Sequence, residues 1–503
     1  MAAKRRGEPL RKPHRLALPL LILLLAASEA VWITLLKFDA VNGSRAVLTF
    51  LALLFALFAL FALSALVVSK LDDQRGALPV IAAGAILFRL TMLPAGLPAQ
   101  SSWQEKVSAL RADVAGAEVT YERFLLYDHD IWRYLWDGHV AAHGVNPFQF
   151  APNNPQLDSL TGADNAAPPN DRGVWGDIRD NVNHPAVPTI YPPLAQSVFR
   201  LAHAVAPGSV LVMKSLLTGF DLLAALLLAL TLRRLNQPVT RVILYAWNPL
   251  VIKAFAASGH VDAVLVAALA ATAYFFAGGR RRVAAISFGL AVLAKLTPIV
   301  LLPFVVKRTG WRNATLIAAV LLAGYAPFAS AGSGMFTGLL TFAREWQFNA
   351  GPYALAEWLI GHINHDPAMA ARAVCGLVII GVILFLAWRD DGRAVSFASY
   401  AAPALGALVV FSPTVMPWYV IWALPLAIIA RFRVWVYFSA LVCAAFQVMV
   451  DETERGWVLW LEYGLFALVC AMEYFRAIGK RARDASPPPP RRTSECLCDL
   501  HRP

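Results

Sequence analysis

The sequence predicts an all-α integral membrane protein that crosses the bilayer many times. Of its 503 residues 58% are hydrophobic and only 15% are charged, whereas soluble domains carry about 25% charged residues. The mean hydropathy is +0.56. Apolar runs such as 46–69 and 210–232 recur along the chain, and about 20 apolar residues suffice to cross the hydrocarbon core of a bilayer. Membrane spanning explains all of these features together.

The basic residues are distributed as membrane topology requires. The chain has 44 Lys and Arg residues against 32 Asp and Glu residues, which gives a net charge of +12. Short basic clusters stand at the ends of apolar runs, and cytoplasmic loops carry such an excess of Lys and Arg. We therefore expect a multi-pass protein of the bacterial inner membrane, surrounded by lipids and without a nucleic-acid partner. The clusters are Lys4 to Arg6, Arg233 and Arg234, Arg280 to Arg282, Lys307 and Arg308, Arg431 and Arg433, and Lys480 to Arg483.

The apolar runs predict about 12 to 14 membrane segments in four regions. Residues 1–95 hold three spans, so the chain leaves the third span on the outer side. Residues 96–208 form a large extracytoplasmic loop, which is rich in Asn and Pro turn signals and ends in an interfacial helix near 194–206. Residues 209–478 form the transmembrane core, and residues 479–503 form a disordered cytoplasmic tail. The expected spans lie near 16–37, 46–69, 78–95, 210–232, 241–257, 261–278, 313–330, 370–388, 395–411, 418–430, 434–451 and 456–475.

The segment 283–306 differs from the other apolar runs. Basic clusters flank both of its ends, and Lys295-Leu296-Thr297-Pro298 interrupts it. A single crossing would place one basic cluster on the outer side. We therefore predict two half-helices that meet near Lys295, where the broken backbone makes an intramembrane cation a functional candidate.

The large loop contains the strongest candidate for catalysis, the acidic pair Asp128 and Asp130. Two carboxylates one residue apart can flank one reacting group or hold a divalent cation. Neighbouring carboxylates also raise one another's pKa, which suits a general base. Aromatic residues follow, including Tyr134, and can pack against sugars or at the membrane interface. The alternative is the start of a solvated helix, because Asp is favourable at a helix N-terminus.

Further motifs follow the acidic pair in an ordered series. They are Asn146-Pro147-Phe148, Asn183-His184-Pro185, Tyr191-Pro192-Pro193, Trp247-Asn248-Pro249 with Gly259-His260-Val261-Asp262, Lys295-Leu296-Thr297-Pro298, and Ser412-Pro413 with Pro417-Trp418-Tyr419 and Trp422. The series resembles the GT-C superfamily of polyprenyl-phosphate-sugar-dependent glycosyltransferases. It is most similar to the bacterial family 87 mannosyltransferases and to the catalytic subunit of the eukaryotic GPI mannosyltransferase I. Unlike that family's usual pattern, two helices precede the first core span, and residues 99–127 form an insertion.

The resemblance implies an inverting transfer of a sugar, mannose by analogy, from a polyprenyl-phosphate donor to a hydroxyl of a lipid or glycan acceptor on the outer face. Such a reaction needs a base for the acceptor and positive charge for the departing phosphate. The position of Asp128 in the family's motif favours it as the base, with Asp130 beside it. Arg89 and Lys214 are other membrane cations, for which the alternative is a structural pairing with Asp221 or with another segment. The expected substrate-binding residues are Arg133, Tyr134, His184, Tyr191, Lys253, His260, Asp262, Lys295, Trp418 and Tyr419.

Two other classes of protein remain open at this point. A lipid-linked glycan polymerase or ligase would carry a different charged loop, usually rich in Arg and His, without an early acidic pair. A transporter or flippase would show repeat symmetry and a charged path through the bilayer centre. Here the acidic and aromatic residues gather at one face, and no strong internal repeat is found in the sequence.

Overall fold

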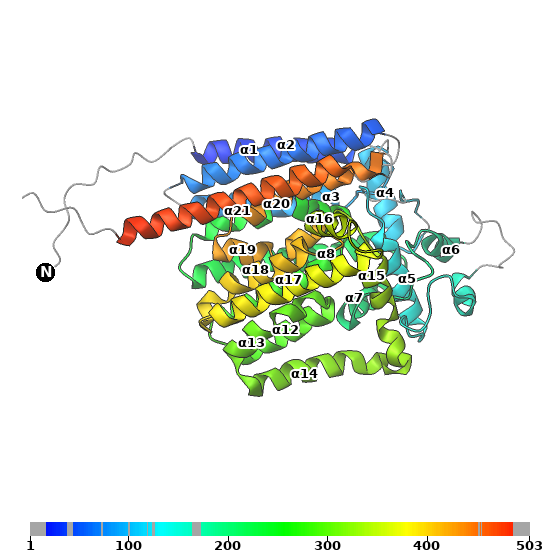
Figure 1. The fold of residues 1–503 in the computed structure, drawn as a ribbon. Coiled ribbons are helices and arrows are strands. Elements are labelled where there is room, and N and C mark those ends of the chain that lie inside the picture. Colours follow the sequence, from blue (N-terminus) through cyan, green and yellow to red (C-terminus); the bar gives the residue numbers. More distant parts are fainter. Residues whose placement is uncertain are drawn as a thin grey trace, which may run out of the picture.

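The long helices of this computed structural model run side by side, and α5, α6 and the connections around them cover one end of the bundle (Figure 1). The structure describes residues 17–37, 44–71, 74–98, 101–117, 119–122, 126–162, 173–450, 453 and 455–485. Within these ranges every regular element is a helix, and strand-like pairing is confined to two isolated bridges, Ala95 with Leu97 and Phe348 with Thr414. The predicted all-α class is thus confirmed. The cluster Lys4 to Arg6 and residues 486–503 lie outside the described part of the chain.

Six helices are long and apolar enough to cross a membrane. They span Ala17–Leu36, Arg45–Ser69, Val210–Arg234, Trp311–Glu345, Pro367–Arg389 and Gly456–Phe475. Four shorter apolar helices cover Gly76–Met92, Asp262–Ala277, Ala394–Val410 and Val434–Val450. Large apolar side chains on these helices remain exposed, as a lipid-facing surface requires. The protein is therefore a multi-pass membrane protein.

The helical elements follow one another with short connections. The N-terminal helices are α1 (Ala17–Leu36), α2 (Ser44–Ser69) and α3 (Gln74–Met92), and the loop region contains α4 (Trp103–Val114), α5 (Asp130–Ala142), η1 (Pro155–Thr161), α6 (Gly173–Asp180) and α7 (Pro193–Val205). The next elements are α8 (Val210–Arg234), η3 (Val239–Val242), α9 (Ile243–Ala246), α10 (Pro249–Ile252), η4 (Lys253–Ala257), α11 (Asp262–Ala277), α12 (Arg281–Ala294), η5 (Thr297–Leu301) and α13 (Leu302–Thr309). The last are α14 (Trp311–Tyr325), η6 (Ala326–Phe336), α15 (Thr337–Glu345), α16 (Gly351–Ile360), α17 (Pro367–Arg389), η7 (Ala394–Ser396), α18 (Phe397–Val410), η8 (Pro417–Trp422), α19 (Leu424–Ala430), α20 (Val434–Leu441), η9 (Val442–Val450) and α21 (Gly456–Ala485).

Breaks in the helices explain where polar groups enter the bundle. The predicted break near Lys295 is confirmed, because Lys295 is extended (φ −158°, ψ 139°) between α12 and η5. The predicted continuous span at 241–257 is wrong. Its backbone divides into η3, α9, α10 and the π-helical η4, because Pro249 lacks the N–H that a continuous helix would need. Asn248 caps the restart by accepting a hydrogen bond from the Leu250 N–H at 3.0 Å.

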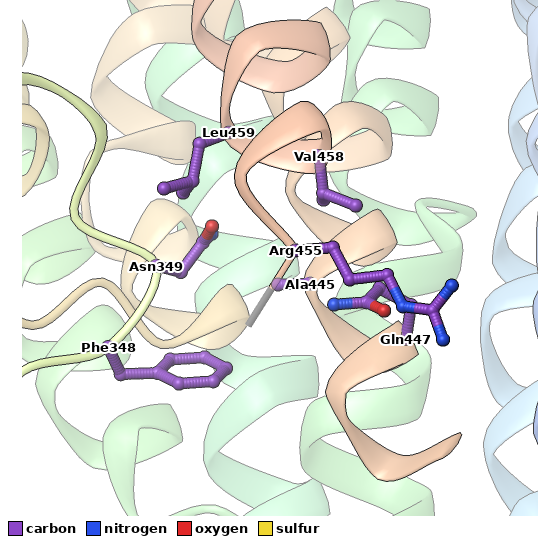
Figure 2. A pocket seen from close by; sticks show the side chains of 7 residues that line it. All are labelled: Phe348, Asn349, Ala445, Gln447, Arg455, Val458 and Leu459. Carbon is purple, nitrogen blue, oxygen red and sulfur yellow. The ribbon is translucent and has the colours of Figure 1, made fainter. Parts of the chain in front are cut away.

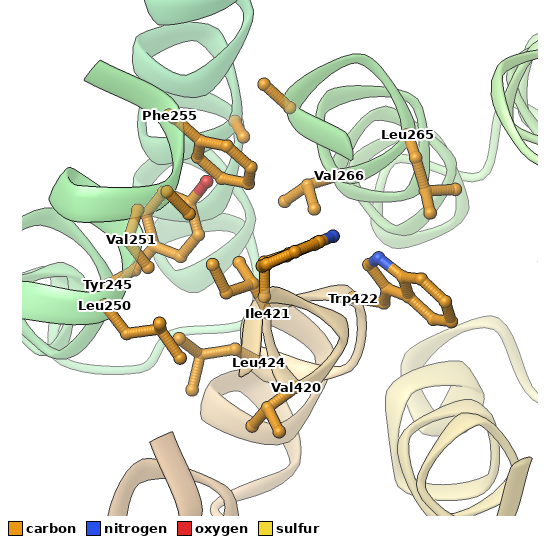
Figure 3. Packing of buried hydrophobic residues seen from close by; sticks show 14 of the residues in the cluster. Tyr245, Leu250, Val251, Phe255, Leu265, Val266, Val420, Ile421, Trp422 and Leu424 are labelled. Carbon is orange, nitrogen blue, oxygen red and sulfur yellow. The ribbon is translucent and has the colours of Figure 1, made fainter. Parts of the chain in front are cut away.

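The tightest packing lies where these broken segments meet η8 and α11. Tyr245, Val251 and Phe255 face Ile421 and its neighbours across the interface (Figure 3), and all five side chains shown at its centre are fully buried: Tyr245, Leu250, Val251, Phe255 and Ile421. Close packing of this kind fixes the ends of short helices that could not be stable alone. The core therefore holds Lys253, at the start of η4, in a defined position.

Candidate active site

The acidic pair stands at the start of α5, which packs against α7. Gly138 permits the close approach, since a Cβ there would lie 2.5 Å from the Phe199 carbonyl oxygen. One turn earlier the Tyr134 ring stacks on the Phe199 ring, with centroids 4.6 Å apart. The predicted helix at 194–206 is confirmed as α7, but its buried face includes Gln196, whose amide donates to Asp137 at 3.0 Å and to Thr189 at 2.9 Å.

Asp128 lies deepest and is enclosed by two basic side chains. Lys253 Nζ contacts Asp128 Oδ2 directly, and His260 Nε2 lies 3.0 Å from the same oxygen. All three side chains are buried. Trp418 stacks on the His260 ring with centroids 3.7 Å apart, and Lys253 Nζ lies 4.2 Å from the Phe446 ring centroid. The two basic groups thereby compensate the cost of burying a carboxylate.

Asp130 occupies a more open position. Its Oδ1 accepts a hydrogen bond from the Asn183 amide at 2.8 Å, and its Oδ2 lies 3.6 Å from His260 Nδ1. The Asp130 side chain is 22% exposed, against 6% for Asp128. His260 therefore lies between the two carboxylates, while Lys253 is close to one of them only.

The carboxylates do not raise one another's pKa, contrary to the sequence-based expectation. Burial raises the pKa of Asp128, but the charges of Lys253 and His260 outweigh burial and leave this pKa below its usual value. For Asp130, burial is likewise outweighed by contact with His260, with smaller effects from His129 and Asn183, so its pKa is also lowered. Both acids are therefore ionised at neutral pH.

A second charged cluster forms where α11 begins and α12 ends. Lys295 Nζ lies 2.8 Å from Asp262 Oδ1, which also accepts a hydrogen bond from the Trp422 indole at 2.6 Å. The ammonium lies 4.6 Å from the Tyr419 ring centroid and 4.7 Å from that of Trp422. The Lys295 side chain is 21% exposed. It is thus a cation held by one carboxylate and two rings, with a surface still accessible.

One cavity, with about 1200 Å³ of empty volume, joins these groups. Sequence-predicted residues form much of its wall, namely Asp128, Asp130, Arg133, His184, Tyr191, Asp262, Lys295, Trp418 and Tyr419. Three predicted residues stand behind the wall. Lys253 and His260 contact Asp128 from the protein side, and Tyr134 is fully buried between Tyr191 and Phe199, its ring centroid 5.0 Å from that of Tyr191. Arg133 itself is held by Asp137 at 2.9 Å and by the Val187 carbonyl at 2.9 Å.

Two membrane cations have structural partners away from the cavity, as the alternative interpretation held. Arg89 pairs with Asp221 (2.5 Å), which also accepts from the Tyr245 hydroxyl at 2.8 Å. Lys214 donates to the carbonyls of Leu93 (2.6 Å) and Ala95 (2.9 Å) just after α3. These contacts join α3 to α8 and α9 and leave neither cation in the cavity wall.

Sequence reasoning missed several residues of the wall. His129 and Asn183 stand inside motifs that were recognised, so they could have been included. Apolar residues from distant segments gave no signal, because nothing distinguishes them from lipid-facing side chains. These are Phe342 and Phe348, Met416, and Phe446, Val448 and Met449 of η9.

Phe348 also lines a second, smaller hollow of about 210 Å³ on the other side of η9. In Figure 2 Phe348 and Asn349 lie opposite Gln447 and Arg455. The Asn349 amide donates to Glu462 at 2.8 Å, and the Tyr463 hydroxyl donates to the Asn349 carbonyl at 2.7 Å. These bonds attach the loop after α15 to α21.

The charges around the acidic pair also bear on metal binding. Among the described residues no group of three or more His, Cys, Asp or Glu side chains is arranged to hold an ion. The Lys253 ammonium already occupies the position beside Asp128 that a divalent cation would take. The residues present therefore do not fit a metal between the two carboxylates, and no chemical step below is derived through one.

Comparisons with known proteins agree with this architecture. A family model described as "Alpha-(1->6)-mannopyranosyltransferase, N-terminal domain" matches residues 124–310, and one described as "MptB C-terminal domain" matches residues 351–476. The first match contains the acidic pair, Lys253, His260 and Lys295. The chain is thus a membrane glycosyltransferase of the GT-C superfamily.

Within that superfamily the chain belongs to the family 87-like mannosyltransferases. It is 24% identical over 408 residues to alpha-(1->6)-mannopyranosyltransferase A of Mycobacterium tuberculosis. That alignment covers 72% of this chain and 74% of the mycobacterial protein. The similarity therefore extends beyond the cavity to most of the transmembrane bundle.

Proposed function

We propose that this mannosyltransferase moves a mannosyl residue from a polyprenyl-phosphate donor to a hydroxyl group of a lipid or envelope-glycan acceptor. The reaction takes place on the extracytoplasmic face and inverts the anomeric centre. One observation carries the proposal: a carboxylate, Asp130, and a partly exposed cation, Lys295, line the same cavity. Transfer from a sugar phosphate needs both groups, a base for the acceptor and a positive charge for the leaving phosphate.

The contacts favour Asp130, not Asp128, as the base. Asp128 is enclosed by Lys253 and His260, so its charge is already compensated. Asp130 faces the cavity and is oriented by the Asn183 amide. Asp128 then has a positioning role, because it holds His260, and His260 in turn lies beside Asp130. Each carboxylate has its own environment, and the environment assigns the role.

The proposed reaction is a single displacement. Asp130 accepts the proton of the acceptor hydroxyl while the acceptor oxygen forms a bond to the anomeric carbon of the donor. The bond from that carbon to the phosphate oxygen breaks on the opposite side, and its electron pair leaves with the polyprenyl phosphate. Lys295 stabilises the negative charge that develops on this oxygen. Attack opposite to the leaving group inverts the configuration.

Asp130→Asn tests the proposal, because the amide keeps the size of the side chain but cannot take a proton at neutral pH. We expect transfer from a labelled polyprenyl-phosphate mannose to fall at least about 100-fold, the usual contribution of a general base. Asp158→Asn is the matched control. It removes a carboxylate of the same loop region that pairs with Arg179 at 2.8 Å outside the cavity wall.

The outcome separates the proposed roles of the two acids. Full transfer by a folded Asp130→Asn variant would exclude the base, and loss of transfer in Asp158→Asn would show that the effect is not specific to the cavity. A wild-type protein inactive with every polyprenyl-phosphate sugar would exclude the donor class.

A further inference from the structure

An aromatic rim borders the cavity on the side of Asp130. The edge of the His184 ring meets the Trp346 ring, with centroids 4.5 Å apart and planes at 68°. Phe342 extends this surface, its centroid lying 5.3 Å from that of Trp346. All three rings line the cavity, and the Trp346 side chain is only half-buried. Part of a large aromatic surface therefore remains open beside the proposed base.

The rim and the Lys295 cluster contact different groups of the site. His184 follows Asn183 in the chain, and the Asn183 amide holds Asp130. Lys295 contacts Asp262, Tyr419 and Trp422 instead. The base must lie at the acceptor hydroxyl and the cation at the donor phosphate. The rim is accordingly associated with the acceptor.

The main chain at Trp346 is held in place by bonds on both sides. Arg372 of α17 donates to the carbonyls of Arg344 (2.7 Å) and Trp346 (3.2 Å) and to the Tyr353 hydroxyl (2.8 Å). Two residues further on, the Phe348 N–H donates to the Pro413 carbonyl at 3.0 Å, and the Phe348 carbonyl accepts from the Val415 N–H at 2.8 Å. The indole is thus held before any substrate arrives, which lowers the entropy cost of binding.

We propose that Trp346 is an acceptor-binding residue, against which a sugar ring of the acceptor packs, and that Arg372 is the positioning residue for it. An aromatic face and the C–H groups of a pyranose form such a contact, and a neighbouring carboxylate then meets one hydroxyl. This inference rests on the proposed function, because it takes Asp130 as the base. It implies that a saccharide, not a bare lipid alcohol, receives the mannosyl group.

The test is a steady-state analysis of the full-length protein with two substrates. The donor is labelled polyprenyl-phosphate mannose, and the acceptor is a synthetic mannose disaccharide with an alkyl tail. We expect Trp346→Ala to raise the acceptor KM about 10-fold, since an aromatic contact contributes about 1 kcal/mol. The donor KM should stay within about twofold, and Trp346→Phe should recover part of the loss. The matched control is Trp358→Ala, which removes a 63% exposed tryptophan of α16 outside the cavity wall.

Arg372→Gln separates positioning from general stability. We expect it to raise the acceptor KM in the same direction, and to add little when combined with Trp346→Ala, because both changes remove one contact. Additive losses in the double variant would overturn the positioning role. An unchanged acceptor KM in Trp346→Ala, or a rise in the donor KM alone, would overturn the rim as acceptor site. If wild type transfers no mannose from this donor, the proposed function fails, whereas normal transfer with an unaffected Trp346→Ala variant refutes only the rim.

Discussion

At the scale of single residues, the acidic pair owes its properties to partners that are far away in the sequence. Lys253 lies 125 positions after Asp128, yet its ammonium group contacts the carboxylate. The sequence pattern identified Asp128, Asp130, Lys253 and His260 as candidates, but it could not show which group pairs with which. That pairing decides which carboxylate is free to act, and it comes from tertiary packing at the broken segment α10–η4.

Lys253→Met tests this buried pair through protein stability. Removing the ammonium leaves the Asp128 carboxylate with His260 alone, and breaking a buried ion pair on one side costs about 3 kcal/mol or more. We expect a lower thermal unfolding temperature for the purified protein. The double variant Lys253→Met with Asp128→Asn should regain most of that loss, because no buried charge is left. Equal stability of the single variant and wild type would contradict the pairing.

The dependence of transfer on pH tests the environment of Asp130. Its pKa is lowered, chiefly because His260 opposes the effect of burial, so the carboxylate stays ionised as pH falls to its ordinary range. We expect kcat/KM for wild type to keep its neutral value down to about pH 4, near the usual pKa of Asp. His260→Gln removes a cation 3.6 Å from Asp130 and raises this pKa. Its acid limb should move up by roughly one pH unit, and a shift downward would refute the assignment.

At the scale of helices and loops, prediction succeeded where proline and charge gave a local signal. Pro298 and the flanking basic clusters predicted the break at Lys295, and the turn at Pro192-Pro193 predicted the start of α7. The same reasoning failed at 241–257, where apolar composition suggested one span although Pro249 interrupts it. The aromatic rim around Trp346 lies after α15, and only the bridge between Phe348 and Thr414 brings it to the cavity. Such a contact across 66 positions leaves no trace in local sequence.

The packing of α5 on α7 makes a prediction at the same scale. A Cβ at Gly138 would lie 2.5 Å from the Phe199 carbonyl oxygen and 2.9 Å from its carbonyl carbon, and this backbone has no rotamer with which to yield. We expect Gly138→Ala to separate the helices and to lower stability by about 1–3 kcal/mol. Gly219→Ala is the matched control, because a Cβ there meets nothing within 4 Å. A Gly138→Ala variant as stable as the control would contradict the close contact.

At the scale of the whole molecule, the two ends of the bundle differ in charge and in use. Basic residues of separate clusters meet at one end. Arg308 forms a two-pronged pair with Asp390 (2.5 and 2.8 Å), Arg234 contacts the Tyr274 carbonyl at 3.1 Å, and Arg241 reaches the Ile428 carbonyl. The connection from α17 to α18 lies at the opposite end from α5 and α6 (Figure 1). The distribution of Lys and Arg in the sequence predicted this polarity, because it depends on topology and not on packing.

The polarity leads to a prediction about the membrane side of the cavity. Single cysteines are introduced at the exposed positions Gln156, in η1 near the cavity end, and Arg393, near Asp390 at the basic end, in a protein whose native cysteines are replaced. An impermeant maleimide applied to spheroplasts should label Gln156→Cys, while Arg393→Cys should react only after the membrane is opened. The positive-inside rule requires this order, since the basic end faces the cytoplasm. Labelling of Arg393→Cys alone in sealed spheroplasts would place Asp130 in the cytoplasm, and a lipid-linked donor would then have to present its sugar there.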